Sequence, residues 1–370
     1  MSEELERDLN KLMRQKIEKM EDFSEKGIEN FAKKYEVDTY AEDIKENFAD
    51  LEGETVRMAG RIMALRTHGK ASFADIQDMT GKMQLYVKVD LIGEDRYEFF
   101  TELDMGDIIG LKGEVFKTNR GQISVKVKSF NLLTKSIRPL PEKFHGLKDK
   151  EMRYRQRYLD LIMNPEVKDT IETRSKIIRS FRDILEEKDF LEVETPMMHP
   201  IPGGANAKPF VTHHNALDME LYLRIAPELY LKRLIVGGFD RVYEINRNFR
   251  NEGMSYKHNP EFTTLELYQA QADYHDMMDI TEELIVESAK ETLDTTEITY
   301  QDQEIDLSIP WKRVTMKELV KERTGFDYDA LEDSDSAYKK AEELGVKIEE
   351  KDLSKGEVLY EVFETLVEED

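Results

Sequence analysis

The sequence has 370 residues, 39% of them hydrophobic and 36% charged, with no cysteine and a formal net charge of −24 at pH 7. The lack of cysteine excludes disulfides, thiolate metal sites and a cysteine nucleophile. Because no apolar run approaches the roughly 18 residues that a membrane span needs, we expect a soluble, cytoplasmic protein without membrane contacts.

The negative charge is concentrated near the C-terminus of the sequence. Residues 271–370 carry 11 basic and 30 acidic side chains, whereas residues 51–150 carry 17 basic and 14 acidic ones. The segment 51–150 is therefore net basic, which favours it for contacts with phosphate groups.

Residues 1–50 are predicted to form an N-terminal helical extension. Apolar residues recur there at helical spacing, and we predict a long amphipathic helix over residues 3–35. Because this helix is acidic, we expect it to pack on the next domain rather than on nucleic acid. Its apolar stripe consists of Leu5, Leu9, Leu12, Met13, Ile17 and Met20.

Residues 51–138 alternate between apolar and polar residues in five short runs. The runs cover residues 56–66, 71–78, 82–89, 108–117 and 122–132, with a short helix near residues 97–103. This pattern is typical of the OB-fold, a small β-barrel that often binds single-stranded nucleic acid. The fold alone does not determine a function, and the alternation by itself favours a core position for Phe73.

Two prolines, Pro139 and Pro141, mark a predicted linker over residues 139–165. The linker contains an arginine-rich stretch, residues 153–157, which is either a solvated basic segment or the start of the next domain. Asn164 and Pro165 then predict a helix start. An apolar stripe follows, then a short strand over residues 190–195, and we assign residues 166–370 to a second domain.

Residues 241–270 predict two antiparallel strands joined by a polar loop. Arg250 and Glu252 lie at the rim of this loop, and Phe262 lies just after it. A guanidinium group can grip a phosphate with two hydrogen bonds, and a phenylalanine ring can stack on a base. An exposed charged hairpin is the alternative interpretation.

Two motifs in this stretch resemble motif 2 of the class II aminoacyl-tRNA synthetases. They are Phe249-Arg250-Asn251-Glu252 and His258-Asn259-Pro260-Glu261-Phe262-Thr263. Within that class, the flanking residues 202–205 and 222–232 resemble the bacterial-type lysyl-tRNA synthetases. The resemblance implies an α+β protein in which an N-terminal helix and an OB-fold β-barrel precede a partial class II antiparallel-sheet catalytic domain.

The resemblance also implies a reaction, partners and a role for each matching residue. Lysine is activated by ATP, with magnesium, to lysyl-adenylate and is transferred to tRNA(Lys), and residues 171–196 build a homodimer interface. Arg250 and Glu252 are implied to be catalytic. ATP is implied to be bound by Arg250, Glu252, His258, Asn259 and Phe262, lysine by Gly204, Glu228, Glu266 and Tyr268, and the tRNA anticodon by Arg66, Phe73 and Gln84.

An acidic pocket suits lysine, because the ammonium group of its side chain has three donors to satisfy. The same pocket disfavours a sister enzyme specific for aspartate or asparagine. Another pair, His213 and His214, resembles a metal site, but adjacent residues on a strand point to opposite faces. We therefore expect no metal to bind there.

The sequence departs from the family after residue 300. The family carries a glycine-rich motif 3 with an arginine, preceded by carboxylates that hold magnesium. Here the arginines after Arg250 are Arg313 and Arg323, and the glycines after residue 300 form no Gly-x-Gly pattern. We expect an N-terminal portion of the enzyme whose metal ligands lie beyond Asp370, and which is poorly active alone. The alternative is a non-catalytic module that binds tRNA or a protein partner.

Overall fold

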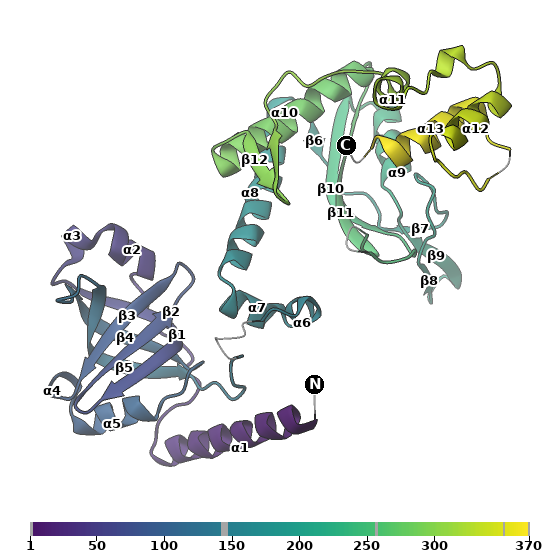
Figure 1. Ribbon diagram of the computed structural model, residues 1–370. Helices are drawn as coiled ribbons and strands as arrows, with labels where there is room; N and C mark the ends of the chain where they lie inside the picture. The colour runs from purple at the N-terminus through teal and green to yellow at the C-terminus, as the bar shows by residue number, and fades with distance from the viewer. Residues whose placement is uncertain (1–2, 142–146, 256–257, 351, 369–370) are drawn as a thin grey trace. The chain divides into compact units, whose positions relative to one another are not determined.

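The computed structural model describes residues 3–141, 147–255, 258–350 and 352–368 (Figure 1). The chain divides into two compact units, residues 1–168 and 169–370, and each is described by itself. Across these described residues, no helix combines the length and the apolar character that crossing a membrane requires.

The first unit is built on a closed barrel of five strands. The strands are β1 (Thr55–His68), β2 (Ala71–Gln77), β3 (Lys82–Lys88), β4 (Ile108–Lys117) and β5 (Ile123–Thr134), in the order β1-β2-β3-β5-β4. Strand β1 closes the barrel by pairing with both β2 and β4. Helices α4 (Val89–Ile92) and α5 (Glu94–Glu102) connect β3 to β4. The five strands were predicted from the alternation, and the helix expected near residues 97–103 overlaps α5.

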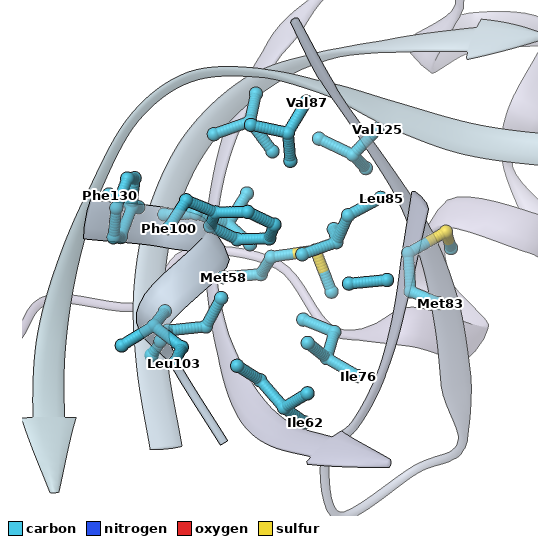
Figure 2. Close-up of a cluster of buried hydrophobic side chains, with 14 of the residues drawn as sticks. Met58, Ile62, Ile76, Met83, Leu85, Val87, Phe100, Leu103, Val125 and Phe130 are labelled. Atoms are coloured by element: carbon cyan, nitrogen blue, oxygen red, sulfur yellow. The ribbon is translucent and has the colours of Figure 1, made fainter. Parts of the chain in front are cut away.

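The barrel encloses a core of alternate side chains from all five strands (Figure 2). Met58, Ile76, Leu85 and Val125 are fully buried inside it. Because successive strand residues point to opposite faces, the residues between these positions lie on the outer surface. Phe73 is one of them: it is half-buried between buried Ser72 and buried Ala74, so the prediction of a core position for Phe73 is wrong.

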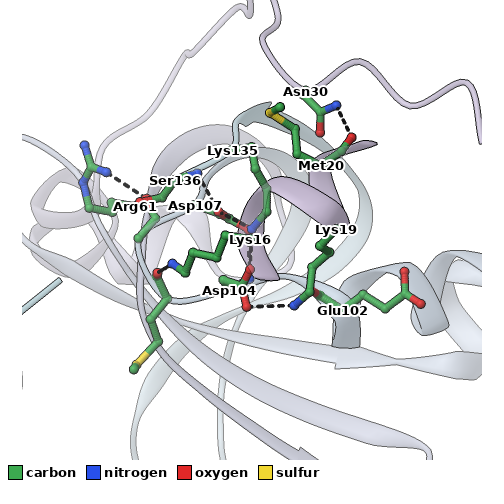
Figure 3. Close-up of polar contacts among 12 residues, drawn as sticks. Lys16, Lys19, Met20, Asn30, Arg61, Glu102, Asp104, Asp107, Lys135 and Ser136 are labelled. Atoms are coloured by element: carbon green, nitrogen blue, oxygen red, sulfur yellow. Dashed lines mark hydrogen bonds and ion pairs between the residues drawn. The ribbon is translucent and has the colours of Figure 1, made fainter. Parts of the chain in front are cut away.

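Helix α1 (Glu3–Glu25) lies against the barrel through a network of charged residues (Figure 3). Lys135 is fully buried, and its Nζ donates to Asp107 at 2.8 Å and also to Asp104. Lys19 of α1 donates to the same Asp104 at 2.8 Å. The helix ends ten residues before the predicted limit, because Gly27 takes a positive φ of 74° that a continuing helix does not allow.

Short helices flank the barrel in the first unit, and part of the predicted linker is helical. Helices α2 (Ala41–Glu46) and α3 (Phe48–Leu51) precede the barrel, and α6 (Lys150–Arg155) and α7 (Arg157–Met163) follow it. The buried carboxylate of Asp160 accepts from Arg153 at 2.7 Å and from Arg157. The arginine-rich stretch is therefore partly neutralised by its own aspartate. Residues 142–146 of the predicted linker lie outside the described residues.

The second unit contains a three-stranded sheet in the order β11-β10-β6. Strands β10 (Arg241–Phe249) and β11 (Glu261–Gln269) are antiparallel, and β6 (Leu191–Glu192) is parallel to β10. One face of the sheet packs on α8 (Glu166–Glu187) and α10 (Tyr274–Leu293) through Tyr243, Ile245, Leu265 and Leu267. We expected strands over residues 241–245 and 265–270, and each observed strand runs four residues further into the predicted loop.

A smaller sheet and a helix cluster complete the second unit. Strands β7 (Met198–His199), β9 (Met219–Leu223) and β8 (Val211–His214) form the smaller sheet, and α9 (Glu228–Val236) follows it. Beyond the β12 (Glu297–Tyr300) and β13 (Gln303–Asp306) hairpin lie α11 (Met316–Thr324), α12 (Ser334–Glu343) and α13 (Lys355–Leu366). The three helices bury a core of their own, which includes Val320, Phe326, Ala337 and Val358.

Candidate functional site

The face of β10 and β11 opposite α8 and α10 is polar. Across the two strands Glu244 pairs with Glu266, Asn246 with Thr264, and Asn248 with Phe262. Directly opposed residues in an antiparallel pair share a face, so these side chains lie together on the side away from the apolar core. The residues of β10 just before Arg250 are polar on this face. We therefore predicted them as part of the loop, although they belong to the strand.

Arg250 and Phe262 come together at one end of this polar face. Arg250 is the first residue after β10, and its backbone N–H donates to the Pro260 carbonyl at 2.9 Å. Its guanidinium lies 5.2 Å from the centre of the Phe262 ring, and its Nε is buried without a hydrogen-bond partner. A cation beside an aromatic face, with a free donor, suits a phosphate next to a base.

The loop after Arg250 holds the other predicted nucleotide-binding residues. Glu252 is exposed and accepts from the backbone N–H of Lys208 at 3.2 Å. His258 is also exposed, and its Nδ1 lies 2.8 Å from the Ser255 hydroxyl. Asn259 is exposed next to it. In the described part of the loop, no hydrogen bond or ion pair joins these side chains to Arg250, whereas Arg250 and Phe262 are in direct contact.

The four predicted lysine-binding residues lie at the other end of the polar face. Gly204 has a φ of 93°, and a Cβ added there would lie 3.1 Å from the Glu228 Cβ. Glu228 begins α9, and its carboxylate accepts from Lys232 at 2.7 Å. Lys232 lies over the Tyr268 ring at 5.9 Å, and the Tyr268 hydroxyl donates to Glu266 at 3.2 Å.

Burial and neighbouring charges shift the pKa values of Glu266 and Tyr268. Burial raises the pKa of the Glu266 carboxyl; the hydrogen bond from Tyr268 lowers it, and the charge of Glu228 raises it again. Burial also raises the pKa of the Tyr268 hydroxyl, and so does the negative charge of Glu266. Two carboxylates in a partly desolvated pocket favour a cationic ligand.

Sequence reasoning missed a buried ion pair beneath this face. Arg224 is 1% exposed, and its Nη1 donates to the Glu244 carboxylate at 2.7 Å. The signal was available, because Leu223-Arg224-Ile225 places an arginine inside an apolar run, and a buried arginine needs an anionic partner. Reasoning also missed Lys232, which occupies the carboxylate of Glu228.

On the barrel, the predicted anticodon residues lie on neighbouring strands of the outer surface. Phe73 pairs with Arg66 across β1 and β2, and its ring lies 5.2 Å from that of Tyr86 on β3. Gln84 accepts from the Ser124 hydroxyl at 3.0 Å. Arg66 is bound by Asp75 through two hydrogen bonds of 3.0 and 3.1 Å.

The aromatic surface extends further than we predicted. The Tyr86 ring lies 6.0 Å from that of Phe116, and Lys126 lies over Phe116 at 5.1 Å. A row of rings beside basic side chains is the usual platform for single-stranded nucleic acid. Both additional rings alternate with core residues in the sequence, a signal that could have identified them.

A metal site is not evident among the described residues, where no group of three or more His, Cys, Asp or Glu could hold an ion. His213 instead pairs with Asp218 at 3.3 Å, and His214 Nδ1 accepts from the Leu217 backbone N–H at 3.2 Å. The carboxylates present do not form a magnesium cage, and we derive no step through that ion.

Comparison with known proteins decides the family. Residues 149–354 match the family described as tRNA synthetases class II (D, K and N), and residues 56–133 match the OB-fold nucleic acid binding domain. A protein of Carboxydothermus hydrogenoformans named lysine–tRNA ligase is 60% identical over 361 residues, covering 98% of this chain and 74% of the relative. The chain belongs to the lysine–tRNA ligase family.

Further ligases of this family show the same extent of similarity. The lysine–tRNA ligase of Pelotomaculum thermopropionicum is 58% identical over 98% of this chain and 72% of its own length. That of Moorella thermoacetica is 55% identical over 97% of this chain and 73% of its own length. The predicted resemblance and the predicted α+β class, with an OB-fold barrel before a class II synthetase domain, are therefore confirmed.

Proposed function

We propose that the chain binds lysine and ATP on the polar face of β10 and β11, for ATP-dependent formation of lysyl-adenylate and transfer of lysine to tRNA(Lys). One observation carries this proposal. A single antiparallel pair of strands carries the hydrogen-bonded Glu266 and Tyr268 at one end and a guanidinium beside an aromatic ring at the other. A substrate with an amine and a carboxylate can therefore meet a nucleotide phosphate on one surface.

In the proposed reaction, a carboxylate oxygen of lysine attacks the α-phosphorus of ATP. The new bond joins this oxygen to phosphorus, and the bond to the β-phosphate oxygen breaks, so that pyrophosphate leaves with the electron pair. The attacking carboxylate is already ionised and needs no general base. Catalysis then depends on position and charge. Arg250 would hold the α-phosphate and the carboxylate, and Phe262 would stack on the adenine.

The remaining residues would fix the two substrates. Glu252 would accept from the adenine amine, and His258 and Asn259 would hold the phosphates or the loop. Glu228 would bind the α-ammonium of lysine, and its pairing with Lys232 shows that it already holds an ammonium group. Glu266 and Tyr268 would bind the side-chain ammonium, and Gly204 would leave room beside Glu228.

The barrel is proposed to bind the anticodon of tRNA(Lys). Phe73 would stack on a base, and Arg66 and Gln84 would contact base edges. We assign residues 1–50 to an N-terminal extension, 51–138 to the barrel, 139–165 to a linker and 166–370 to the synthetase domain. A homodimer, a cytoplasmic location and magnesium bound with ATP complete the proposal, which the family similarity supports.

The test is calorimetric titration of the chain with lysine, with arginine and ornithine as controls. The proposal requires lysine to bind and Glu228→Gln to abolish binding. If no lysine binds while tRNA(Lys) still does, the second candidate holds, a non-catalytic module that binds tRNA. The basic, aromatic outer face of the barrel is the observation that favours this second candidate.

A further inference from the structure

Arg224 is the only arginine among the largest fully buried side chains of the described residues. It follows β9 directly, and neither it nor its partner Glu244 is reached by solvent, with side chains 0% and 1% exposed. A buried charge is costly unless it is paired and hydrogen-bonded. This position therefore needs an explanation beyond the packing of the small sheet.

Two nitrogens of the guanidinium make hydrogen bonds, and together they reach two segments of the chain. Nη1 donates to Glu244 at 2.7 Å and to the Thr195 hydroxyl at 3.1 Å, while Nε donates to the Arg247 carbonyl at 2.8 Å. Thr195 in turn donates to the second oxygen of Glu244 at 2.6 Å. Nη1 thus ties the segment after β6 to strand β10, and Nε adds a second contact to β10 at Arg247. The single nitrogen of a lysine lacks this planar two-nitrogen geometry.

The backbone of Arg224 adds two further connections. Its N–H donates to the Met197 carbonyl at 2.8 Å, and its carbonyl accepts from the Phe249 N–H at 2.9 Å. Arg250 follows Phe249 directly, and Glu228 lies four residues after Arg224. The same residue therefore sits between the proposed phosphate-binding arginine and the proposed amine-binding glutamate.

Unpartnered polar atoms gather around this junction. Arg224 Nη2, Asn248 Oδ1 and Arg250 Nε are all buried without a hydrogen-bond partner, and they make up half of the six such atoms in the described residues. Buried polar groups are normally satisfied. Their concentration here indicates a polar space that a ligand or water completes.

We propose that Arg224 is a positioning residue that aligns the amino-acid end of the site with the phosphate end. It acts through Glu244, Thr195 and the end of β10 and touches neither reacting atom. The proposal rests on the proposed function. The proposal predicts that nucleotide binding and lysine binding are energetically coupled. A nucleotide that immobilises Arg250 would also immobilise the contacts of Arg224, and Glu228 would then be held in position to bind lysine.

The experiment measures lysine affinity by calorimetry with and without saturating α,β-methylene-ATP, which cannot release pyrophosphate. The unaltered chain is expected to bind lysine at least about fivefold more tightly with the nucleotide, the lower end of usual coupling between sites. Arg224→Lys keeps the charge without the fork, and it is expected to abolish this ratio. Arg155→Lys is the matched control, because Arg155 makes two hydrogen bonds with Glu151 on α6 and both side chains are exposed.

A purely structural role for Arg224 would lower the melting temperature and leave the ratio unchanged, and that result would overturn the inference. If Arg224→Lys does not fold, Arg224→Met combined with Glu244→Gln leaves no unpaired buried charge and is expected to abolish the ratio in the same way. An unaltered chain that binds lysine without any nucleotide effect would overturn only the inference. An unaltered chain that binds no lysine would overturn the proposed function as well.

Discussion

Glu266 is proposed to bind the lysine ammonium, and its burial opposes folding when the carboxyl is ionised. Its pKa is raised by burial, so the folded state favours the protonated carboxyl relative to the unfolded chain. Its contribution to stability is present below the unfolded pKa and is lost as the pH rises through the folded pKa. At neutral pH the ionised form therefore weakens the fold, while a lysine ligand needs that same charge.

We predict that Glu266→Gln raises the melting temperature at pH 7 and weakens lysine binding about ten- to a hundredfold, as expected when a charged hydrogen bond worth about 1.5–3 kcal/mol is lost. Calorimetric melting and lysine titration measure the two effects. Glu261→Gln, an exposed residue on the other face of β11, is the control. Lower stability of Glu266→Gln at pH 7 would contradict the prediction.

A single substitution of Phe73 can test the proposed contact between the barrel and the anticodon. Its half-buried ring lies beside Tyr86 on the outer surface, so its removal leaves the core intact. We predict that Phe73→Ala costs about 1–3 kcal/mol of tRNA(Lys) affinity, the usual value for one stacked base. Filter binding measures it, with Phe31→Ala as the control because Phe31 is exposed outside this row of rings. Equal affinities for the unaltered chain and Phe73→Ala would refute the role.

Among the elements, the barrel strands were predictable and the central strands of the second unit only in part. The barrel has a single apolar core, so alternation determines β2, β3 and β4 to within one residue. In β10 the residues Asn246 and Asn248 lie on the polar site face, and their polarity concealed the strand. A strand whose exposed face carries polar residues of a proposed site loses part of its apolar–polar alternation. Such a strand is therefore harder to predict from the sequence.

Other elements depended on contacts that a single sequence does not reveal. The sequences of α12 and α13 are rich in charged residues, but the two helices bury Ala337 and Val358 in one core with α11. The proposed lysine-binding residues were predicted from the resemblance, whereas Glu244 became evident as the partner of Arg224 only once β9 and β10 were placed together. Pairing between distant segments, rather than local propensity, is the missing information.

Helix α8 and strand β6 carry the predicted dimer interface. Ile171 and Leu191 each leave 47% of their surface exposed, and a two-fold contact would bury each of them twice. We predict that Ile171→Asp with Leu191→Asp raises the dimer dissociation constant at least about tenfold, since burying one such side chain is worth about 1.5–3 kcal/mol. Light scattering across a dilution series measures it, and Leu293→Asp on α10 is the control. A strictly monomeric unaltered chain at high concentration would exclude the interface.

At the scale of the whole molecule, the positions of the arginines after Arg250 bear on the catalytic activity that the chain can have. Arg313 is held by Glu282 at 3.0 Å and by Asp279, and Arg323 lies in the last turn of α11. Neither belongs to the polar face of β10 and β11. Neither of these two arginines therefore lies beside Arg250, which is proposed to hold the α-phosphate.

We predict that a polypeptide of residues 1–370 alone exchanges pyrophosphate with ATP, in the presence of lysine, at least about a thousandfold more slowly than a full-length relative. Loss of one preorganised donor typically costs about a hundred- to a thousandfold, and such losses are not additive. The Carboxydothermus hydrogenoformans ligase, 60% identical, is the reference enzyme. Comparable rates would show that Arg250 suffices.

The burial of Lys135 has a consequence for measuring the barrel itself. Its ammonium is enclosed by Asp104 and Asp107 with no exposed surface, whereas Lys26 at the end of α1 is 57% exposed. An amine-reactive reagent should modify Lys26 at once and Lys135 only when the junction of α1 and the barrel opens, since local opening has its own free energy. Mass spectrometry of the two labelled peptides then measures the rate at which the junction of α1 and the barrel opens, with Lys26 as the internal reference. A nucleic acid that binds the barrel and suppresses this opening would slow the Lys135 reaction and leave the Lys26 reaction unchanged.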